Sequence, residues 1–148
     1  MKPEVDQILG MTAGKLMTEV APELPVGYLQ SSTGLLGIIL GFCAQEYENG
    51  ADIRASENAD MRNLLAELEA SVEDAKLRVK LGAVMGGRDA SLKISELNAD
   101  NAELKTLLIE AQTYLETRSD EKSKVARREI WAVLKTGAKR RLLTLPGA

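Results

Sequence analysis

The sequence contains no histidine and only one cysteine, Cys43. Histidine is the commonest general base and the commonest transition-metal ligand, so its absence removes the usual chemistry of many active sites. A single cysteine cannot form an internal disulfide or a thiolate zinc cluster, which favours the reducing cytoplasm. We therefore expect no cofactor and no metal site, and the sequence favours a role other than catalysis.

Aromatic residues are also scarce, at 3% of the 148 residues. Alanine, leucine, glutamate and lysine are plentiful, which favours helices packed through aliphatic side chains over a sheet rich in β-branched and aromatic residues. The length suits one domain with a sizeable core. The sequence therefore predicts a single all-α domain over residues 1–148.

Charged side chains are missing from residues 24–45, which raises the question of a membrane span. Polar residues interrupt this stretch at 30–33, so continuous apolar or glycine sequence extends only over residues 34–44. A membrane-spanning helix needs about 20 apolar residues. We predict a buried core helix and no membrane span. The early acids Glu4 and Asp6 predict no secretion signal and thus a cytoplasmic protein.

Two stretches repeat apolar residues at gaps of three and four, the spacing of one helix face in a coiled coil. The segment between them is short and contains glycine, which predicts an antiparallel coiled-coil hairpin of residues 61–82 with 92–115. The two series are Met61, Leu65, Leu68, Val72, Ala75, Val79, and Ile94, Leu97, Asn101, Leu104, Leu108, Ala111, Leu115.

The first series continues backward through Gly50 to Gly37 without a change of register. This predicts one long central helix over residues 32–81, with a bend near residues 49–50. Further helices are expected at 3–20, 90–118 and 121–142, the last placing Trp131 near residues 40–43. Prolines at 22 and 25 are expected to end the first helix. The result is an elongated helical bundle whose two-helix end predicts a homodimer.

Small residues form a stripe within the uncharged stretch, at Gly34, Gly37, Gly41 and Ala44. Such a stripe allows another backbone to approach closely, either within the domain or at a subunit interface. Asn101 falls at a core position, where a polar side chain fixes register or oligomeric state by pairing with a like partner, unless it lies at the seam's edge and meets water. These residues are candidate interaction positions.

No segment matches a catalytic motif. Residues 82–87 contain glycines but lack the Gly-Lys-Ser/Thr ending of a phosphate-binding loop, and they are expected to form a turn. Carboxylate pairs such as Glu67 and Glu69 are expected on solvated faces. Cys43, in an apolar run, is expected to be a small buried hydrophobic residue.

The basic C-terminal region is the other candidate. Residues 122–148 contain eight lysines and arginines against one acid, Glu129, so the rest of the chain is acidic. A basic helix can bind nucleic acid, an anionic surface or an acidic protein; it can also simply neutralise the acidic body. The candidate residues here are Lys124, Arg128, Trp131, Lys135, Lys139, Arg140 and Arg141.

Taken together, these patterns predict a structural or protein-interaction helical bundle that self-associates. The alternative function is binding of nucleic acid or an anionic surface through the basic helix at 122–141. The acidic body weakens this alternative because it repels the same phosphates. An acidic protein is the other partner that the basic helix could bind.

Overall fold

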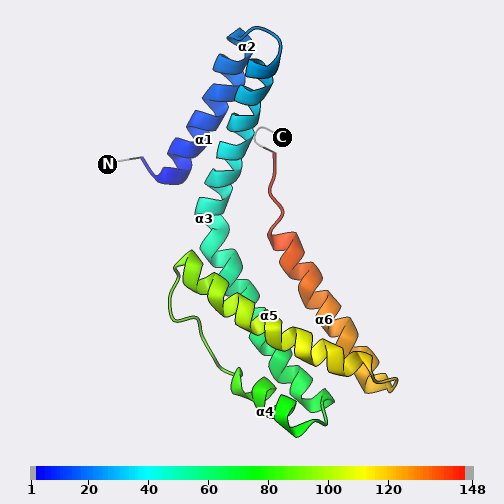
Figure 1. Ribbon diagram of the computed structural model, residues 1–148. Coiled ribbons are helices and arrows are strands. Elements are labelled where there is room, and N and C mark those ends of the chain that lie inside the picture. Colours follow the sequence, from blue (N-terminus) through cyan, green and yellow to red (C-terminus); the bar gives the residue numbers. More distant parts are fainter. Residues whose placement is uncertain (1–2, 146–148) are drawn as a thin grey trace. The chain divides into compact units, whose positions relative to one another are not determined.

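The computed structural model describes residues 3–145, and within this range every regular element is a helix, as the sequence predicted (Figure 1). The outermost residues of the predicted domain, 1–2 and 146–148, lie outside the described part. Contacts divide the chain into two compact units. The first unit comprises the residues up to Gly50 and those from Leu142 onward. The second unit comprises Ala51–Arg141.

The first unit begins with three consecutive helical segments: α1 (Val5–Lys15), the π-helix η1 (Leu16–Val20) and the short α2 (Ala21–Glu23). The predicted end of this helix at residue 20 is wrong by one turn. The wider π turn closes with the Ala21 N–H donating to the Leu16 carbonyl, and Pro22 then follows at the start of α2, where a missing N–H costs little.

A tight turn then leads into the long helix. Leu24 is extended before Pro25, as sterics before proline require. Gly27 has φ of +147°, a conformation that L side chains rarely adopt. The helix α3 (Tyr28–Leu68) follows and continues through Gly50 without interruption, so the predicted long helix is confirmed over most of its length.

The predicted C-terminal bound of the long helix, residue 81, is wrong. The 3₁₀ turn η2 (Glu69–Ser71) ends α3, and Val72 is extended. A new helix, α4 (Ala75–Ala83), starts at Asp74, whose carboxylate accepts a 2.8 Å hydrogen bond from the Leu77 N–H. An N-cap of this kind satisfies an amide that has no partner inside the helix.

This break also changes the apolar face beyond Val72. In α4 the buried residues are Leu77 and Leu81, whereas Val79 of the predicted series is 74% exposed. The second series behaves as predicted: helix α5 (Ile94–Glu116) buries Leu97, Asn101, Leu104, Leu108, Ala111 and Leu115, and only Ile94 at its start is exposed.

The directions of the helices differ from the predicted hairpin. Helix α4 runs antiparallel to α5, because its start lies near Thr113 and Tyr114 and Lys80, further along, binds Glu110 at 2.7 Å. The antiparallel direction predicted for residues 61–82 therefore holds only for residues 75–83. The second-unit part of α3 runs in the same direction as α5. Arg54 lies at Asn98 near the start of α5, and Glu73, just beyond the end of α3, has its N–H at the Tyr114 hydroxyl near the end of α5.

Helix α6 (Glu121–Arg140) completes the second unit and runs antiparallel to α3. At one end Arg141 binds Glu57, and at the other Lys122 donates to the Ala70 carbonyl. The shared core of α3, α4, α5 and α6 consists of Met61, Leu64, Leu65, Leu68, Val72, Leu77, Leu81, Leu104, Leu108, Ala111, Leu115, Ala126 and Ile130.

Asp120 caps the N-terminus of α6. Its carboxylate accepts hydrogen bonds of 2.9 Å from the Ser123 N–H and 2.9 Å from the Ser123 hydroxyl. These bonds stabilise the charged form and lower the pKa of Asp120 from 3.8 to about 2. Arg127, one turn further on, donates to the Leu115 and Arg118 carbonyls at 2.5 and 3.0 Å, so α6 also closes the end of α5.

The lowered pKa of Asp120 predicts a specific acid sensitivity. A carboxylate with a depressed folded-state pKa stabilises the fold fully above its unfolded pKa and loses that contribution as pH falls through the folded value. We therefore expect Asp120→Asn to be less stable toward urea than the wild type at pH 6. The stability of the two proteins should become similar as the pH falls from about 4 to about 2. A stability difference that is independent of pH would contradict this assignment.

Candidate interaction surfaces

The predicted stripe of small residues lies against the first helical segments of the same chain. Gly37 and Gly41 are buried, whereas Gly34 and Ala44 are partly exposed. A Cβ atom built on Gly37 would lie 2.5 Å from the Met17 Cγ and 3.0 Å from the Ala13 carbonyl oxygen. The close backbone approach expected of this stripe is therefore an intrachain contact between α3 and the segment α1–η1.

The opposite side of the same helix carries large apolar residues that stay largely exposed in the described part of the first unit. At 100° per residue, these positions are centred nearly opposite the glycine stripe. Leu35 is 57% exposed, Leu36 55%, Ile39 46% and Tyr47 57%, and Cys43 is also exposed. We call these five residues the α3 outer face. The prediction that Cys43 is buried is wrong, because this face of the helix has no intrachain partner among the described residues.

Other apolar residues of the first unit are exposed as well. On α1, Val5 is 43%, Ile8 46% and Met11 74% exposed. The C-terminal segment after α6 is held at Gln45, whose side chain bonds Thr144 through three hydrogen bonds of 2.7 to 3.1 Å. Its leucines are exposed too, with Leu145 at 60%.

The charged residues of the first unit are almost all acidic. Lys15 is the only basic residue in the sequence from 3 to 50, against six acids. These acids are Glu4, Asp6, Glu19, Glu23, Glu46 and Glu48. Among residues 3–145, no helix combines the length and apolar character that crossing a membrane requires.

Asn101 has the like partner that its core position predicted, and that partner is Asn58 of the same chain. The Asn101 side chain donates to Asn58 Oδ1 at 2.8 Å, and both residues are buried. Asn58 in turn donates to the Leu97 carbonyl at 3.1 Å and to Asp89 at 2.9 Å. The pair thus connects α3 to α5 inside the second unit.

Asp89 extends this network into the connection between α4 and α5. Arg62 donates to its carboxylate at 2.7 Å, and both side chains are largely buried. Burial raises the pKa of Asp89, but the hydrogen bonds from Arg62 and Asn58 and the charge of Arg62 lower it below its ordinary value overall. Neither Asn58 nor Asp89 was predicted, since a polar residue in a heptad reveals its partner only after the helices are placed.

The basic helix uses several of its cations inside the fold. Arg140 binds Asp60 at 2.5 Å, Arg141 binds Glu57 through two bonds of 2.6 and 2.5 Å, and Arg128 binds Glu121 at 3.2 Å. Much of this basic charge therefore neutralises acidic side chains nearby, which was one of the predicted roles.

Other candidate residues of this helix face outward. Trp131 is 64% exposed. Lys135 and Lys139 are exposed as well, and within residues 3–145 neither has an ion pair. Lys124 approaches Glu121 at 3.4 Å. These side chains leave a modest basic surface with one large aromatic residue.

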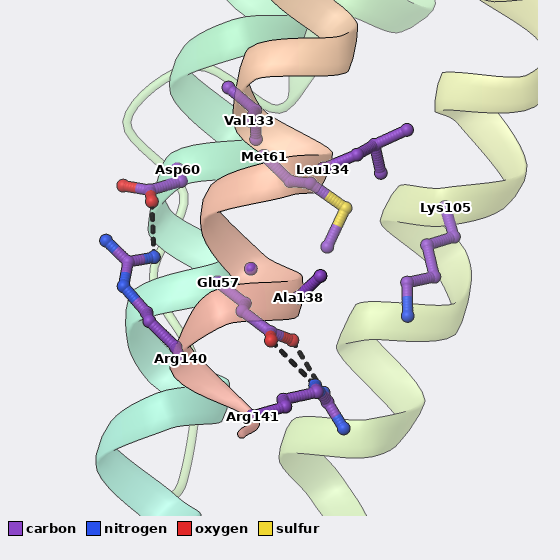
Figure 2. A pocket seen from close by; sticks show the side chains of 10 residues that line it. Glu57, Asp60, Met61, Lys105, Val133, Leu134, Ala138, Arg140 and Arg141 are labelled. Atoms are coloured by element: carbon purple, nitrogen blue, oxygen red, sulfur yellow. Dashed lines mark hydrogen bonds and ion pairs between the residues drawn. The ribbon is translucent and has the colours of Figure 1, made fainter.

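A pocket of about 220 Å³ lies among α3, α5 and α6 in the second unit (Figure 2). Met61, Val133 and Leu134 contribute apolar walls. The ion pair of Glu57 and Arg141 borders one side, and Figure 2 shows Lys105 extending from α5 toward the pocket opposite α6. The sequence patterns did not point to this pocket, because its lining residues come from three helices that are distant along the chain.

Within the described residues, no group of three or more Cys, Asp or Glu side chains is arranged to hold a metal ion. The arrangement instead offers two places for recognition: the uncovered apolar face of the first unit and the pocket of the second. No protein-family model, curated protein or solved structure matches this chain.

Proposed function

We propose that this protein is a helical interaction module that self-associates through the α3 outer face. The observation that carries the proposal is the exposure of Leu35, Leu36, Ile39, Cys43 and Tyr47 on one side of a helix whose other side is already packed. A helix that is apolar all round is stable when it is enclosed all round. The glycine side is enclosed by α1 and η1, and the outer side needs a partner.

A second copy of this chain suits that face better than an anionic surface does. Two copies can bring Leu35, Leu36, Ile39 and Cys43 together without opposing charges of one sign, because residues 24–45 carry no charge. Nucleic acid and anionic lipid would instead meet the six acids of residues 3–50 and a single lysine. In a two-fold dimer, the outer face of each chain would also cover the outer face of the other chain.

The experiment introduces a charge into the face. Ile39→Glu should weaken the dimer at least tenfold, because a carboxylate buried without a partner is costly. Light scattering coupled to gel filtration, over a concentration series up to about 100 µM, measures the shift toward monomer. Ile109→Glu is the matched control, since Ile109 is 64% exposed on α5 in the second unit.

Two outcomes would contradict the proposal. A wild-type protein that stays monomeric up to about 100 µM has no functional self-association through this face. A dimer that Ile39→Glu leaves unchanged, with the helical circular dichroism also unchanged, uses another surface. Loss of the dimer by Ile109→Glu alone would move the interface to the second unit.

The basic helix remains the alternative interaction site. Support for nucleic-acid or anionic-surface binding comes from Lys135 and Lys139, but Arg140 and Arg141 are engaged by Asp60 and Glu57. Of these partners, an acidic protein that contacts Trp131, Lys135 and Lys139 suits the basic helix best, because binding it requires fewer free cations than binding nucleic acid or an anionic surface does. We also keep a cytoplasmic location as part of the proposal.

A further inference from the structure

The pocket of the second unit combines an apolar interior with an uneven charge balance at its edge. Its cations are Lys105, Arg140 and Arg141, and its acids are Glu57 and Asp60. Arg140 pairs with Asp60, and Arg141 pairs with Glu57. Among residues 3–145, no ion pair engages Lys105, so one positive charge remains beside the pocket after the others are matched.

The apolar walls lie close to that charge. Figure 2 shows the side chains of Met61, Leu134 and Ala138 on the side of α3 and α6 that faces Lys105. Met61 is only 4% exposed, so an occupant that reaches it is shielded from water on that side. The ion pair of Glu57 with Arg141 closes the polar end, and its acceptor oxygens are already used by the arginine.

We propose that this pocket binds a small organic carboxylate with a short apolar tail. The carboxylate lies at the Lys105 ammonium, and the tail lies against Met61 and Leu134. A volume of about 220 Å³ is below the roughly 300 Å³ at which drug-sized pockets begin, so the occupant is small. The unmatched positive charge selects an anion, and the apolar walls select against a fully polar one such as inorganic phosphate.

The test uses hexanoate as the probe and 1-hexanol as its neutral counterpart. The ε-methyl group of Met61, labelled with ¹³C and assigned through Met61→Leu, reports occupation by its chemical shift. We expect a saturable shift with hexanoate and a much weaker response to 1-hexanol. Added salt should weaken hexanoate binding, because it screens the charge of the exposed Lys105.

Two kinds of variant test the contribution of the Lys105 charge and that of the pocket volume separately. Lys105→Gln should weaken hexanoate about tenfold, which corresponds to about 1.4 kcal/mol, and Lys105→Arg should retain most of the affinity. Ala138→Leu should abolish binding by filling the pocket. Ala132→Leu, at an exposed position of the same helix that does not line the pocket, is the control and should bind as the wild type does.

The proposal fails if the Met61 methyl does not respond to hexanoate at tens of millimolar. It also fails if 1-hexanol binds as tightly as hexanoate, or if Lys105→Gln has no effect, because the cation would then not select the ligand. Binding that survives Ala138→Leu in a protein with native circular dichroism places the site elsewhere. These outcomes are independent of dimer formation, since Ile39→Glu leaves the pocket residues unchanged.

Discussion

Replacing Asn58 with leucine should destabilise the protein by about 3 kcal/mol, even though leucine is the more apolar side chain. Asn58 has no exposed surface, and its amide joins Asn101, the Leu97 carbonyl and Asp89. Leucine would leave the buried Asn101 amide without its acceptor. An unsatisfied buried polar group costs more than the hydrogen bond contributed, so the penalty outweighs the gain in apolar burial.

Urea unfolding followed by circular dichroism measures this loss, and a double-mutant cycle tests its cause. The combined Asn58→Leu and Asn101→Leu variant should be less destabilised than the sum of the two single variants, by about 1 kcal/mol or more. Asn63→Leu is the control, because Asn63 is exposed on the same helix, and its effect should stay within about 0.5 kcal/mol. Additive single effects would mean that the two asparagines do not act as a pair.

Gly37→Ala should destabilise the first unit by about 1–2 kcal/mol, against the usual preference of a helix for alanine. The new methyl group would lie 2.5 Å from Met17 Cγ and 3.0 Å from the Ala13 carbonyl oxygen. Met17 can turn away, but the carbonyl is backbone, so α1 and α3 must move apart. This overpacking cost exceeds the gain of about 1 kcal/mol in helix propensity.

Gly34→Ala provides the matched comparison one helical turn away. No atom lies within 4 Å of a Cβ built on Gly34, so alanine there should stabilise by about 0.4–1 kcal/mol through the smaller entropy of the unfolded chain. Hydrogen exchange of the α1 amides, together with urea unfolding, reports both variants. Opposite signs are the expected result, and stabilisation by both substitutions would show that α1 does not lie close against Gly37.

Much of the helix content could be predicted from local patterns. The series from Leu97 to Leu115 names the buried face of α5 correctly, because a gap pattern of three and four depends only on the pitch of a helix. The end of α3 was harder to predict from the sequence. Val72 fits the apolar series and is buried, but it is extended, and only the N-cap role of Asp74 signals that a new helix begins.

The partners of the predicted residues could not be obtained in the same way. Gly37 and Gly41 were recognised as a place for close approach, and Asn101 as a residue that needs a like partner. The structure supplies α1 and Asn58 from the same chain, so these residues organise the fold. The exposed apolar face lies on the other side of α3, where the sequence had suggested a helix enclosed all round.

The sequence by itself determined the all-α class, the long central helix and the apolar face of α5, since propensity and periodicity act over a few neighbouring residues. Only the tertiary structure decided that α3 runs in the same direction as α5, which side of α3 stays exposed, and that Lys105 and Met61 line the same pocket. An apolar stripe packs against almost any other apolar stripe. The choice among them depends on specific polar and steric fits, such as Asn58 with Asn101 and Gly37 with Met17, which exist only when distant segments come together.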